Sequence, residues 1–420
     1  RAVITEKGEK LLRGGHVWVY ADEVTGFEPI GQTVPDGTPE DGGLVAVRSA
    51  KGRFLGTGFY NSHSRIRLRI LSRNANDRID DAFWQRKTRW ALDYRRQVMG
   101  EQDFACCRLI FGEADGFPGL TVDRFGPVLV AETLCLGIEK RKKMLLDHLI
   151  AILAEHGVSV RAVYERNESE IRKLEGLEQG KGYWSADPDD GGIVEITENG
   201  IRYKVDYVNG QKTGFFLDQK YNRAAVAKLA KGKRVLDCFT HTGSFGLNAA
   251  LGGAESVVSV DISADALETA AVNAKLNGLS DRIEYVCADA FAYLEDLEAS
   301  KTHPFDLIVL DPPAFCKSVA EVEDAYRGYK DINLTAMKLV KEGGFLVSCS
   351  CSHYMSRTLF EKMLAQSARE SGKRVRLVES KTQAPDHPAL LNEEEVGAVR
   401  DNLIEKLTAL YLVPFIKDTN

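Results

Sequence analysis

The pattern of hydrophobic and polar positions divides the 420-residue chain into three parts. Residues 1–75 hold short apolar runs punctuated by Gly and Pro, which predicts a small β-rich domain with strands at 17–20, 42–49, 54–60 and 65–71. In the last run, Arg65, Arg67 and Arg69 alternate with apolar residues. Period-two alternation predicts a strand with one basic face in water.

The second part, residues 76–195, mixes helical and strand periodicities and is predicted as a small α+β middle domain. We expect a connecting helix at 80–99 and a second helix around 139–155. Strands are expected at 107–113, 120–126, 127–134 and 161–167. A hairpin is expected at 194–208, with Asn199-Gly200 as its two-residue turn.

The third part, residues 196–420, changes to a strand–helix alternation from about residue 215. Apolar strands are expected at 234–239, 256–263, 282–289, 305–313 and 343–350. This rhythm predicts an α/β domain with an open, mostly parallel, doubly wound sheet of Rossmann-like type. A last strand is expected at 411–416, after an acidic tail to which we assign no structure.

Composition narrows the class of protein. Hydrophobic residues make up 44% of the chain, enough for a sizeable core, and no apolar run approaches the ~18 residues that span a membrane. The eight Cys show no paired CxxC spacing, so we expect free thiols, no metal site and a cytoplasmic protein without a membrane partner. A homodimer is compatible with the sequence.

Charge is unevenly distributed. The net charge is −6, but 13 basic residues stand against 4 acidic ones between Arg48 and Arg96. A basic segment on an acidic enzyme favours a local phosphate-binding face, and the alternative is a solvated helix with mixed charges. On the first interpretation, the predicted RNA contacts are Arg65, Arg67, Arg69, Arg86, Lys87 and Arg89, with Arg95 and Arg96 on the same helix.

Carboxylates end three successive predicted strands. Asp237 precedes a turn of small residues, Asp261 ends the next strand 24 residues later, and Asp289 follows the third. The turn is not GxGxxG, which disfavours a pyrophosphate and suits a cofactor with amino-acid character. The second carboxylate stands where it can accept ribose hydroxyls. Each alone is equally well read as a helix cap, but the ordered set favours a nucleoside-containing cofactor.

The fourth and fifth strands carry the candidate chemistry. Asp311-Pro312-Pro313 follows the fourth, a pattern typical of enzymes that act on a planar base. The fifth is followed by Cys349 and Cys351. A thiolate that adds to carbon 6 of cytosine makes carbon 5 nucleophilic, whereas small buried cysteines are the structural alternative.

These motifs together resemble the RlmI-type 23S ribosomal RNA cytosine-5 methyltransferases over nearly the whole chain. The matching stretches are HVWVYADEV (16–24), GEADGFPGLTVDRFG (112–126), GQKTGFFLDQ (210–219), VLDCFTHTGSF (235–245), VSVDIS (258–263), DPPAF (311–315), RGYKDIN (327–333), SCSCSHYM (348–355) and DHP (386–388). The resemblance implies an N-terminal PUA-like RNA-binding domain, a middle domain and a catalytic domain that uses S-adenosylmethionine to modify ribosomal RNA.

The resemblance also implies site residues. The nucleophile is Cys351, with Asp311 beside the base, and Cys349 is an addition to the family pattern. The predicted cofactor residues are Phe216, Gln219, Asp237, Phe239, Thr240, Thr242, Gly243, Asp261, Ile262, Ser263, Asp289 and Ala290.

One departure and two alternatives bear on this interpretation. Many RNA cytosine-5 methyltransferases have a second Cys directly after DPP, where this chain has Ala314, and Cys316 stands two residues further on. A guanine-N methyltransferase of ribosomal RNA shares GQKTG and DPPxF but lacks the thiol at Cys351. A non-catalytic RNA-binding assembly factor would not need the set of Asp237, Asp261, Asp311 and Cys351.

Overall fold

The computed structural model describes residues 1–28, 38–185, 187–301, 305–316, 318–352 and 354–390, together with the backbone of 410–416. These residues form two compact units. The first holds 1–194, 205–215 and the segment from 385, and the second holds 195–204, 216–384 and the last strand. Neither unit is one continuous segment, whereas the sequence suggested three consecutive domains.

The N-terminal sheet has the strand order β2-β6-β5-β4-β1-β3. Its strands are β1 (Ala2–Ile4), β2 (Trp18–Tyr20), β3 (Val24–Phe27), β4 (Leu44–Ser49), β5 (Phe54–Tyr60) and β6 (Ile66–Ser72), and helix α1 (Glu6–Arg13) packs beside β2 and β5. The strands expected at 17–20, 42–49, 54–60 and 65–71 are all present. The two short strands β1 and β3, whose apolar runs are too brief to stand out in the sequence, complete the sheet.

The middle sheet has the order β11-β10-β9-β8-β7, with β9 and β10 parallel and the other neighbours antiparallel. Its strands are β7 (Cys106–Phe111), β8 (Leu120–Phe125), β9 (Val128–Thr133), β10 (Ala162–Asn167) and β11 (Gly180–Tyr183), and its helices are α2 (Asp81–Asp103), α3 (Leu136–Glu139), α4 (Lys142–Glu155) and α5 (Ile171–Leu174). The long connecting helix begins at an Asp80 cap and packs on α4 and β7. The strands and helices expected in this part of the chain are present, and they belong to the same compact unit as the N-terminal sheet.

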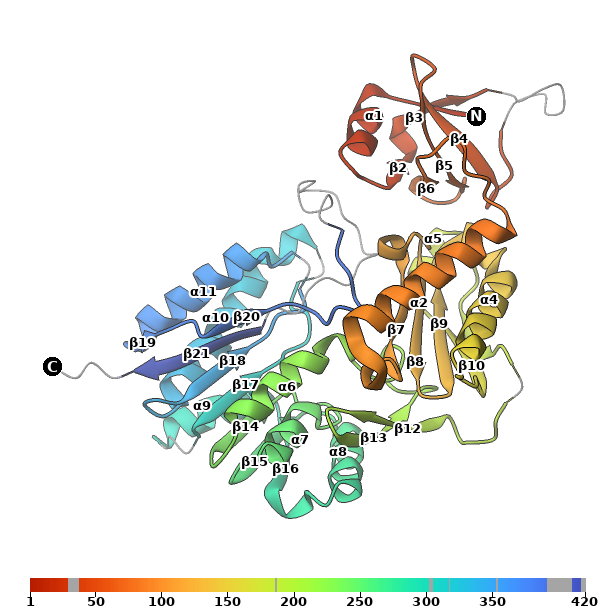
Figure 1. Cartoon of the computed structure of the whole chain (residues 1–420). Coiled ribbons are helices and arrows are strands. Elements are labelled where there is room, and N and C mark those ends of the chain that lie inside the picture. The colour runs from red at the N-terminus through yellow and green to blue at the C-terminus, as the bar shows by residue number, and fades with distance from the viewer. Residues whose placement is uncertain are drawn as a thin grey trace. The chain divides into compact units, whose positions relative to one another are not determined.

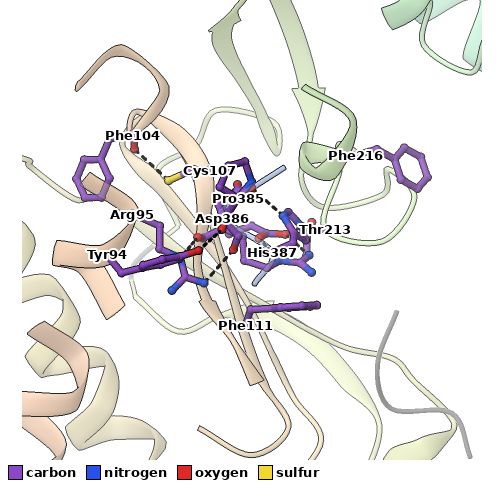
Figure 2. Close-up of polar contacts among 12 residues, drawn as sticks. Tyr94, Arg95, Phe104, Cys107, Phe111, Thr213, Phe216, Pro385, Asp386 and His387 are labelled. Atoms are coloured by element: carbon purple, nitrogen blue, oxygen red, sulfur yellow. Dashed lines mark hydrogen bonds and ion pairs between the residues drawn. The ribbon is translucent and has the colours of Figure 1, made fainter. Parts of the chain in front are cut away.

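The Asp-His-Pro segment of the tail belongs to the first unit. Figure 2 shows it beside residues of α2 and β7. The Asp386 carboxylate accepts the backbone N–H of Arg108 at 2.9 Å, and the Asp386 carbonyl accepts Nη2 of Arg95 at 2.8 Å. The His387 ring lies 5.3 Å from that of Phe111, and its Nδ1 is 2.8 Å from Oδ1 of Asp386. Asp386 therefore fixes both the segment and the histidine.

Two buried arginines support this segment. The guanidinium of Arg95, with no exposed surface, binds both carboxylate oxygens of Asp115 at 2.6 and 2.7 Å. Arg108 binds Asp123 in the same two-pronged way at 2.7 and 2.9 Å, and the Thr213 hydroxyl donates to Asp123 at 2.6 Å. Buried charges are retained when they are paired in this geometry. The GEADGFPGLTVDRFG, GQKTG and DHP motifs thus meet in one ionic network.

The second unit begins with a hairpin. Strands β12 (Ile193–Glu198) and β13 (Ile201–Asp206) flank the predicted turn, in which Asn199 and Gly200 have φ of 53° and 79°. Positive φ at both positions is the requirement of a two-residue type I′ turn. At the end of β12, Glu198 binds Arg223 of α6 (Lys220–Leu229) at 2.7 and 2.9 Å, and both side chains are buried.

The large sheet of the second unit has the order β16-β15-β14-β17-β18-β21-β19, and β20 pairs with β21 (Figure 1). Its strands are β14 (Arg234–Cys238), β15 (Ser256–Asp261), β16 (Ile283–Cys287), β17 (Leu307–Leu310), β18 (Phe345–Ser348), β19 (Arg374–Val375), β20 (Glu379–Lys381) and β21 (Leu410–Ile416). β14 to β18 pair in parallel, and β21 joins β18 antiparallel. The predicted doubly wound, mostly parallel sheet is confirmed, and so is the last strand.

Helices connect the strands of this sheet. They are α7 (Ser244–Leu251), α8 (Ala264–Leu276), α9 (Ala290–Ala299), α10 (Val322–Leu339) and α11 (Arg357–Ser371). Apolar residues of β14, β17 and β18 form one buried cluster with α9, α10 and α11. On α7, a Cβ added at Gly246 would lie 2.5 Å from Oγ of Ser259 in β15. That spacing requires glycine, and it brings the start of α7 close to the sheet.

Within the described ranges, no helix has the length and apolar character that a membrane crossing requires.

Burial predicts that an ion pair of this network contributes more to the free energy of unfolding than an exposed ion pair does. Asp115→Ala leaves the Arg95 guanidinium buried and without its carboxylate, and we expect a loss of about 3–5 kcal/mol in the free energy of unfolding. The matched control is Asp147→Ala, which removes an exposed pair with Lys143 (76% and 54% exposed) and should cost less than about 1 kcal/mol. Urea unfolding of both full-length variants measures the difference, and equal losses would contradict the structural role of Asp115.

Candidate active site

The carboxyl ends of the parallel strands place the predicted residues along one edge of the large sheet. Asp237 lies at the end of β14, Asp261 ends β15, and Asp311 directly follows β17. Cys351 lies three residues after the end of β18. Because β14 pairs with both β15 and β17, the strand order changes direction beside β14, and open α/β sheets bind ligands at such a point.

Asp237 shapes the turn that follows β14. It is fully buried, and its Oδ2 accepts the Thr240 hydroxyl at 2.5 Å and the Gly246 backbone N–H at 2.7 Å. Burial raises the pKa of Asp237 to about 7. Its Oδ1 has no hydrogen-bond partner in the part of the chain that the structure describes. A buried oxygen without a partner is a polar group that a ligand can satisfy.

The turn itself is backbone-strained. Phe239, His241 and Gly243 have φ of 63°, 50° and 84°, and such conformations are uncommon for residues other than glycine. The N–H of His241 donates to Oδ2 of Asp261 at 2.8 Å, which joins the turn to the end of β15. The Phe216 ring lies edge-on to the His241 ring at 5.4 Å. Phe216 thus contacts the turn that follows β14.

The end of β15 combines a carboxylate with exposed apolar surface. Oδ1 of Asp261 accepts the N–H of Ser263 at 2.9 Å, and the Ser263 hydroxyl caps α8. Between them, the Ile262 side chain is 72% exposed. A half-exposed carboxylate beside an exposed isoleucine offers hydrogen-bond acceptors and an apolar surface to a nucleoside.

Other predicted cofactor residues have mainly structural contacts. Asp289 is exposed and caps α9 by accepting the N–H of Ala292 at 3.0 Å. The Ala290 side chain is buried in the core cluster, so its backbone alone can face a ligand. The carbonyl of Thr242 accepts Nδ2 of Asn273 at 3.3 Å.

Gln219, predicted on the cofactor side, contacts Asp311. Its Nε2 lies 3.1 Å from each carboxylate oxygen of Asp311. Its own Oε1 accepts Nδ2 of Asn222 at 2.5 Å, and both amides are buried. GQKTGFFLDQ therefore ends in a residue that orients the carboxyl group of DPP, a role that the motif alone does not reveal.

Asp311 is poised between its two protonation states. Burial, followed by repulsion from Asp218 and Asp237, raises the pKa of Asp311 to about 7, against the opposing influence of Arg223 and Gln219. Below that pH the carboxyl group carries a proton and can donate a hydrogen bond. Above it the group can only accept.

The two thiols after β18 differ in environment. Cys349 has no exposed surface, and its burial together with the nearby Asp311 raises the pKa of this thiol well above its usual range. Cys351 is partly exposed, and its Sγ lies 3.6 Å from the carbonyl oxygen of Pro312. The thiolate is the nucleophilic form of cysteine, so the environment disfavours Cys349 and leaves Cys351 as the accessible thiol.

Cys316 lies in an environment that does not suit the role of the family's second cysteine. It is buried, its thiol donates to the Ser318 carbonyl at 3.0 Å, and burial raises its pKa. The partly exposed residue directly after DPP is Ala314, which has no titratable group.

The predicted basic face is wrong for Arg69. This side chain is 2% exposed and binds Glu113 at 3.0 Å and Glu175 at 2.9 Å. Arg67 is half-buried and donates to the carbonyls of Asn61 and Ser62. The alternation of β6 was recognised, but its second face lies against acidic residues of the middle domain.

The basic helix α2 is also largely compensated. Arg89 binds Glu155 at 2.7 and 3.0 Å, and burial lowers the pKa of Lys87. Arg95 and Arg96 are likewise paired, with Asp115 and with Glu101. Of the predicted RNA contacts, Arg65 and Arg86 have exposed side chains.

The strand-end geometry fits S-adenosylmethionine. The unsatisfied oxygen of Asp237, the turn between Asp237 and Gly246, and the half-exposed Asp261 beside Ile262 would hold its amino-acid and nucleoside parts.

We expect Asp261→Ala to weaken S-adenosylmethionine binding by about 1–3 kcal/mol, because the ribose hydroxyls lose their carboxylate acceptor. Asp265→Ala removes an exposed carboxylate in the first turn of α8; this control variant should bind as the wild type does. Isothermal titration calorimetry measures both. An unchanged affinity in Asp261→Ala would refute the placement of the nucleoside at β15.

Comparison with known proteins identifies the fold and the family. A family model described as S-adenosylmethionine-dependent methyltransferase matches residues 180–399, and a PUA-like domain model matches residues 3–73. Among solved structures, a putative SAM-dependent methyltransferase from Streptococcus mutans has a TM-score of 0.77 at 18% identity, covering 98% of this chain and 99% of that one. SMU.776, a putative methyltransferase complexed with SAH, has a TM-score of 0.78 at 19% identity over the same shares of both chains. At this identity the likeness establishes the fold.

Curated relatives are closer in sequence. Ribosomal RNA large subunit methyltransferase I of Pseudoalteromonas translucida is 40% identical over 390 residues, which are 92% of this chain and 94% of that protein. The enzyme of the same name from Shewanella denitrificans is 41% identical over 382 residues, 90% of this chain and 92% of that protein. The cofactor is therefore S-adenosylmethionine, and the chain belongs to the ribosomal RNA large subunit methyltransferase I family, with a PUA-like domain and a Rossmann-like catalytic domain.

Proposed function

We propose that this enzyme methylates carbon 5 of a cytosine in the 23S RNA of the large ribosomal subunit through a covalent intermediate on Cys351. The observation that carries the proposal is the contrast between the two thiols, one buried beside Asp311 and one partly exposed beside the DPP carbonyl. The names of the curated relatives support the RNA of the large subunit as substrate.

The chemistry needs a nucleophile because carbon 5 of cytosine does not accept a methyl group unaided. The Cys351 thiolate adds to carbon 6, and the electron pair of the 5,6 double bond becomes available at carbon 5. When bound, S-adenosylmethionine supplies an electrophilic methyl group. Loss of the carbon-5 proton then restores the double bond and releases the thiolate.

Asp311 serves the nitrogen edge of the base. In its protonated form it can donate to ring nitrogen 3, where negative charge develops as the thiolate adds. Gln219 binds both carboxylate oxygens and so fixes the orientation of the group. A pKa of about 7 leaves a substantial protonated fraction at neutral pH. Because both faces of the ring react, the cytosine must leave its stack.

The RNA contacts are proposed on the exposed part of the predicted basic surface. Arg86 is exposed on α2, and its guanidinium lies 5.5 Å from the ring centre of Trp90, which is 58% exposed. An exposed arginine and tryptophan suit a phosphate and an unpaired base. Arg65 adds a second exposed cation in the PUA-like domain.

Covalent trapping tests the catalytic proposal. Bisulfite sequencing of ribosomal RNA from cells with and without the gene first identifies the cytosine. An RNA fragment with 5-fluorocytosine at that position has no carbon-5 proton to lose, so the adduct should persist after methylation. We expect a stable protein–RNA adduct, resolved by denaturing electrophoresis, with the wild type and with Cys349→Ala, and none with Cys351→Ala.

The remaining outcomes separate the alternatives. An adduct that survives in Cys351→Ala and disappears in Cys349→Ala would reverse the assignment of the nucleophile. Methylation of the RNA without an adduct in any variant would refute covalent cytosine chemistry and favour a guanine-modifying enzyme. Bound RNA without methylation would indicate an assembly factor.

Charge reversal tests the RNA surface. Arg65→Glu and Arg86→Glu should each weaken RNA binding and reduce the magnitude of its salt slope by about one unit for each lost phosphate contact. Lys143→Glu, at an exposed lysine of α4, is the control. Fluorescence anisotropy over a series of salt concentrations measures both quantities, and slopes equal to the wild type in both variants would show that these arginines are merely solvated.

A further inference from the structure

Tyr329 of α10 is a polar side chain in the core beneath the candidate nucleophile. It is fully buried, with its ring 4.6 Å from that of Phe315 and 5.5 Å from that of Phe360. Its hydroxyl lies 3.1 Å from Oγ of Ser350 and 2.9 Å from Oγ of Ser352. A single phenol thus contacts the residues on either side of Cys351.

Ser352 extends this contact to the segment after DPP. Its Oγ accepts the backbone N–H of Phe315 at 3.0 Å and that of Cys316 at 3.3 Å. The backbone N–H of Ser352 in turn donates to Oγ of Ser350 at 3.3 Å. The segments that follow β17 and β18 are therefore joined through two serine hydroxyls that meet at Tyr329.

The number of hydrogen bonds that each hydroxyl group can donate and accept shows which of them donates to Tyr329. A hydroxyl has two acceptor lone pairs and one proton. Since Oγ of Ser352 already accepts two N–H groups, its proton is the one directed at Tyr329, and Ser350 donates to the same oxygen. The phenol oxygen is thus the common acceptor for both serines. Without it, two buried hydroxyl protons lose their acceptor, which is costly enough to rearrange a loop.

We propose that Tyr329 is a positioning residue for the covalent step: by accepting from Ser350 and Ser352 it holds Cys351 in register with the DPP segment that faces the base. This inference rests on the proposed function, because it assigns Tyr329 to the step that Cys351 performs. Its basis is the juxtaposition of a buried phenol with both neighbours of the nucleophile and, through Ser352, with the backbone after DPP.

The geometry matters because nucleophilic addition requires the reacting atoms at near-contact distance and in alignment. Displacements of about 1 Å in such sites cost up to about a hundredfold in rate. The Sγ of Cys351 lies 3.6 Å from the Pro312 carbonyl oxygen of the same DPP segment. A loosened Ser352 would change the relation between these two segments while leaving the β14 and β15 cofactor residues in place.

The test compares two tyrosines of the same helix. Tyr329→Phe removes the hydroxyl and keeps the ring. The control Tyr326→Phe removes a hydroxyl that donates to Gln366 at 2.8 Å, one turn earlier in α10. Full-length variants react with the 5-fluorocytosine RNA and S-adenosylmethionine under single-turnover conditions. We expect the adduct to form about tenfold more slowly in Tyr329→Phe and at the wild-type rate in Tyr326→Phe.

Accompanying measurements separate positioning from general destabilisation. RNA affinity by anisotropy and S-adenosylmethionine affinity by calorimetry should stay within about twofold of the wild type in Tyr329→Phe, so that kcat falls and KM does not. The variant Ser352→Ala should slow the adduct in the same way, and the double variant should be no slower than the slower single variant. If Tyr329→Phe does not fold, Ser350→Ala and Ser352→Ala decide the matter by the same rate.

The outcomes distinguish this inference from the proposal on which it rests. A wild type that forms no adduct refutes covalent catalysis by Cys351. A wild type that forms the adduct, with Tyr329→Phe equally fast, refutes the positioning role of Tyr329. A loss of cofactor and RNA binding in parallel with the adduct rate would also overturn it, because that pattern indicates a structural tyrosine.

Discussion

Parallel pairing of β14 with both β15 and β17 is the constraint on which the site depends. Parallel strands end at the same edge of a sheet, so residues separated by tens of positions meet there without any local motif that joins them. Asp237 turns the chain back into α7, Asp261 receives the turn through the His241 N–H, and Asp311 follows the neighbouring strand. The glycine at 246 allows α7 to approach closely enough for this arrangement.

Along that edge, side chains of the same type differ in their burial and electrostatic environment. Burial raises the pKa values of both Asp237 and Asp311 to about 7. The same principle separates the thiols, since Cys349 lies beside a carboxylate and Cys351 does not share its complete burial. Environment, rather than residue type, thus distinguishes groups that look interchangeable in the sequence.

Much of this was accessible from the sequence. The strand–helix rhythm predicted the parallel sheet, and with it that the carboxylates at successive strand ends lie along one edge of that sheet. The prediction of a basic face in water was wrong at Arg69. Alternation tells which side chains share a face of the strand, but it does not tell that Glu113 and Glu175 cover that face. The contact between Gln219 and Asp311 and the cluster around Tyr329 join residues distant in the chain, and neither spacing nor composition encodes them. For Asp289, the sequence allowed either a cofactor contact or a helix cap. The structure shows that Asp289 caps α9.

The interleaving of the two units has a consequence for any attempt to dissect this protein. Thr213 and Asp386 make their contacts with Asp123 and with Arg95 and Arg108, yet both lie in the chain after the catalytic unit has begun. A single cut near residue 195 would therefore separate Thr213 and Asp386 from their buried partners in the ionic network. Because segments on both sides of the catalytic unit complete the first unit, the two units are expected to be inherited together rather than exchanged as independent modules.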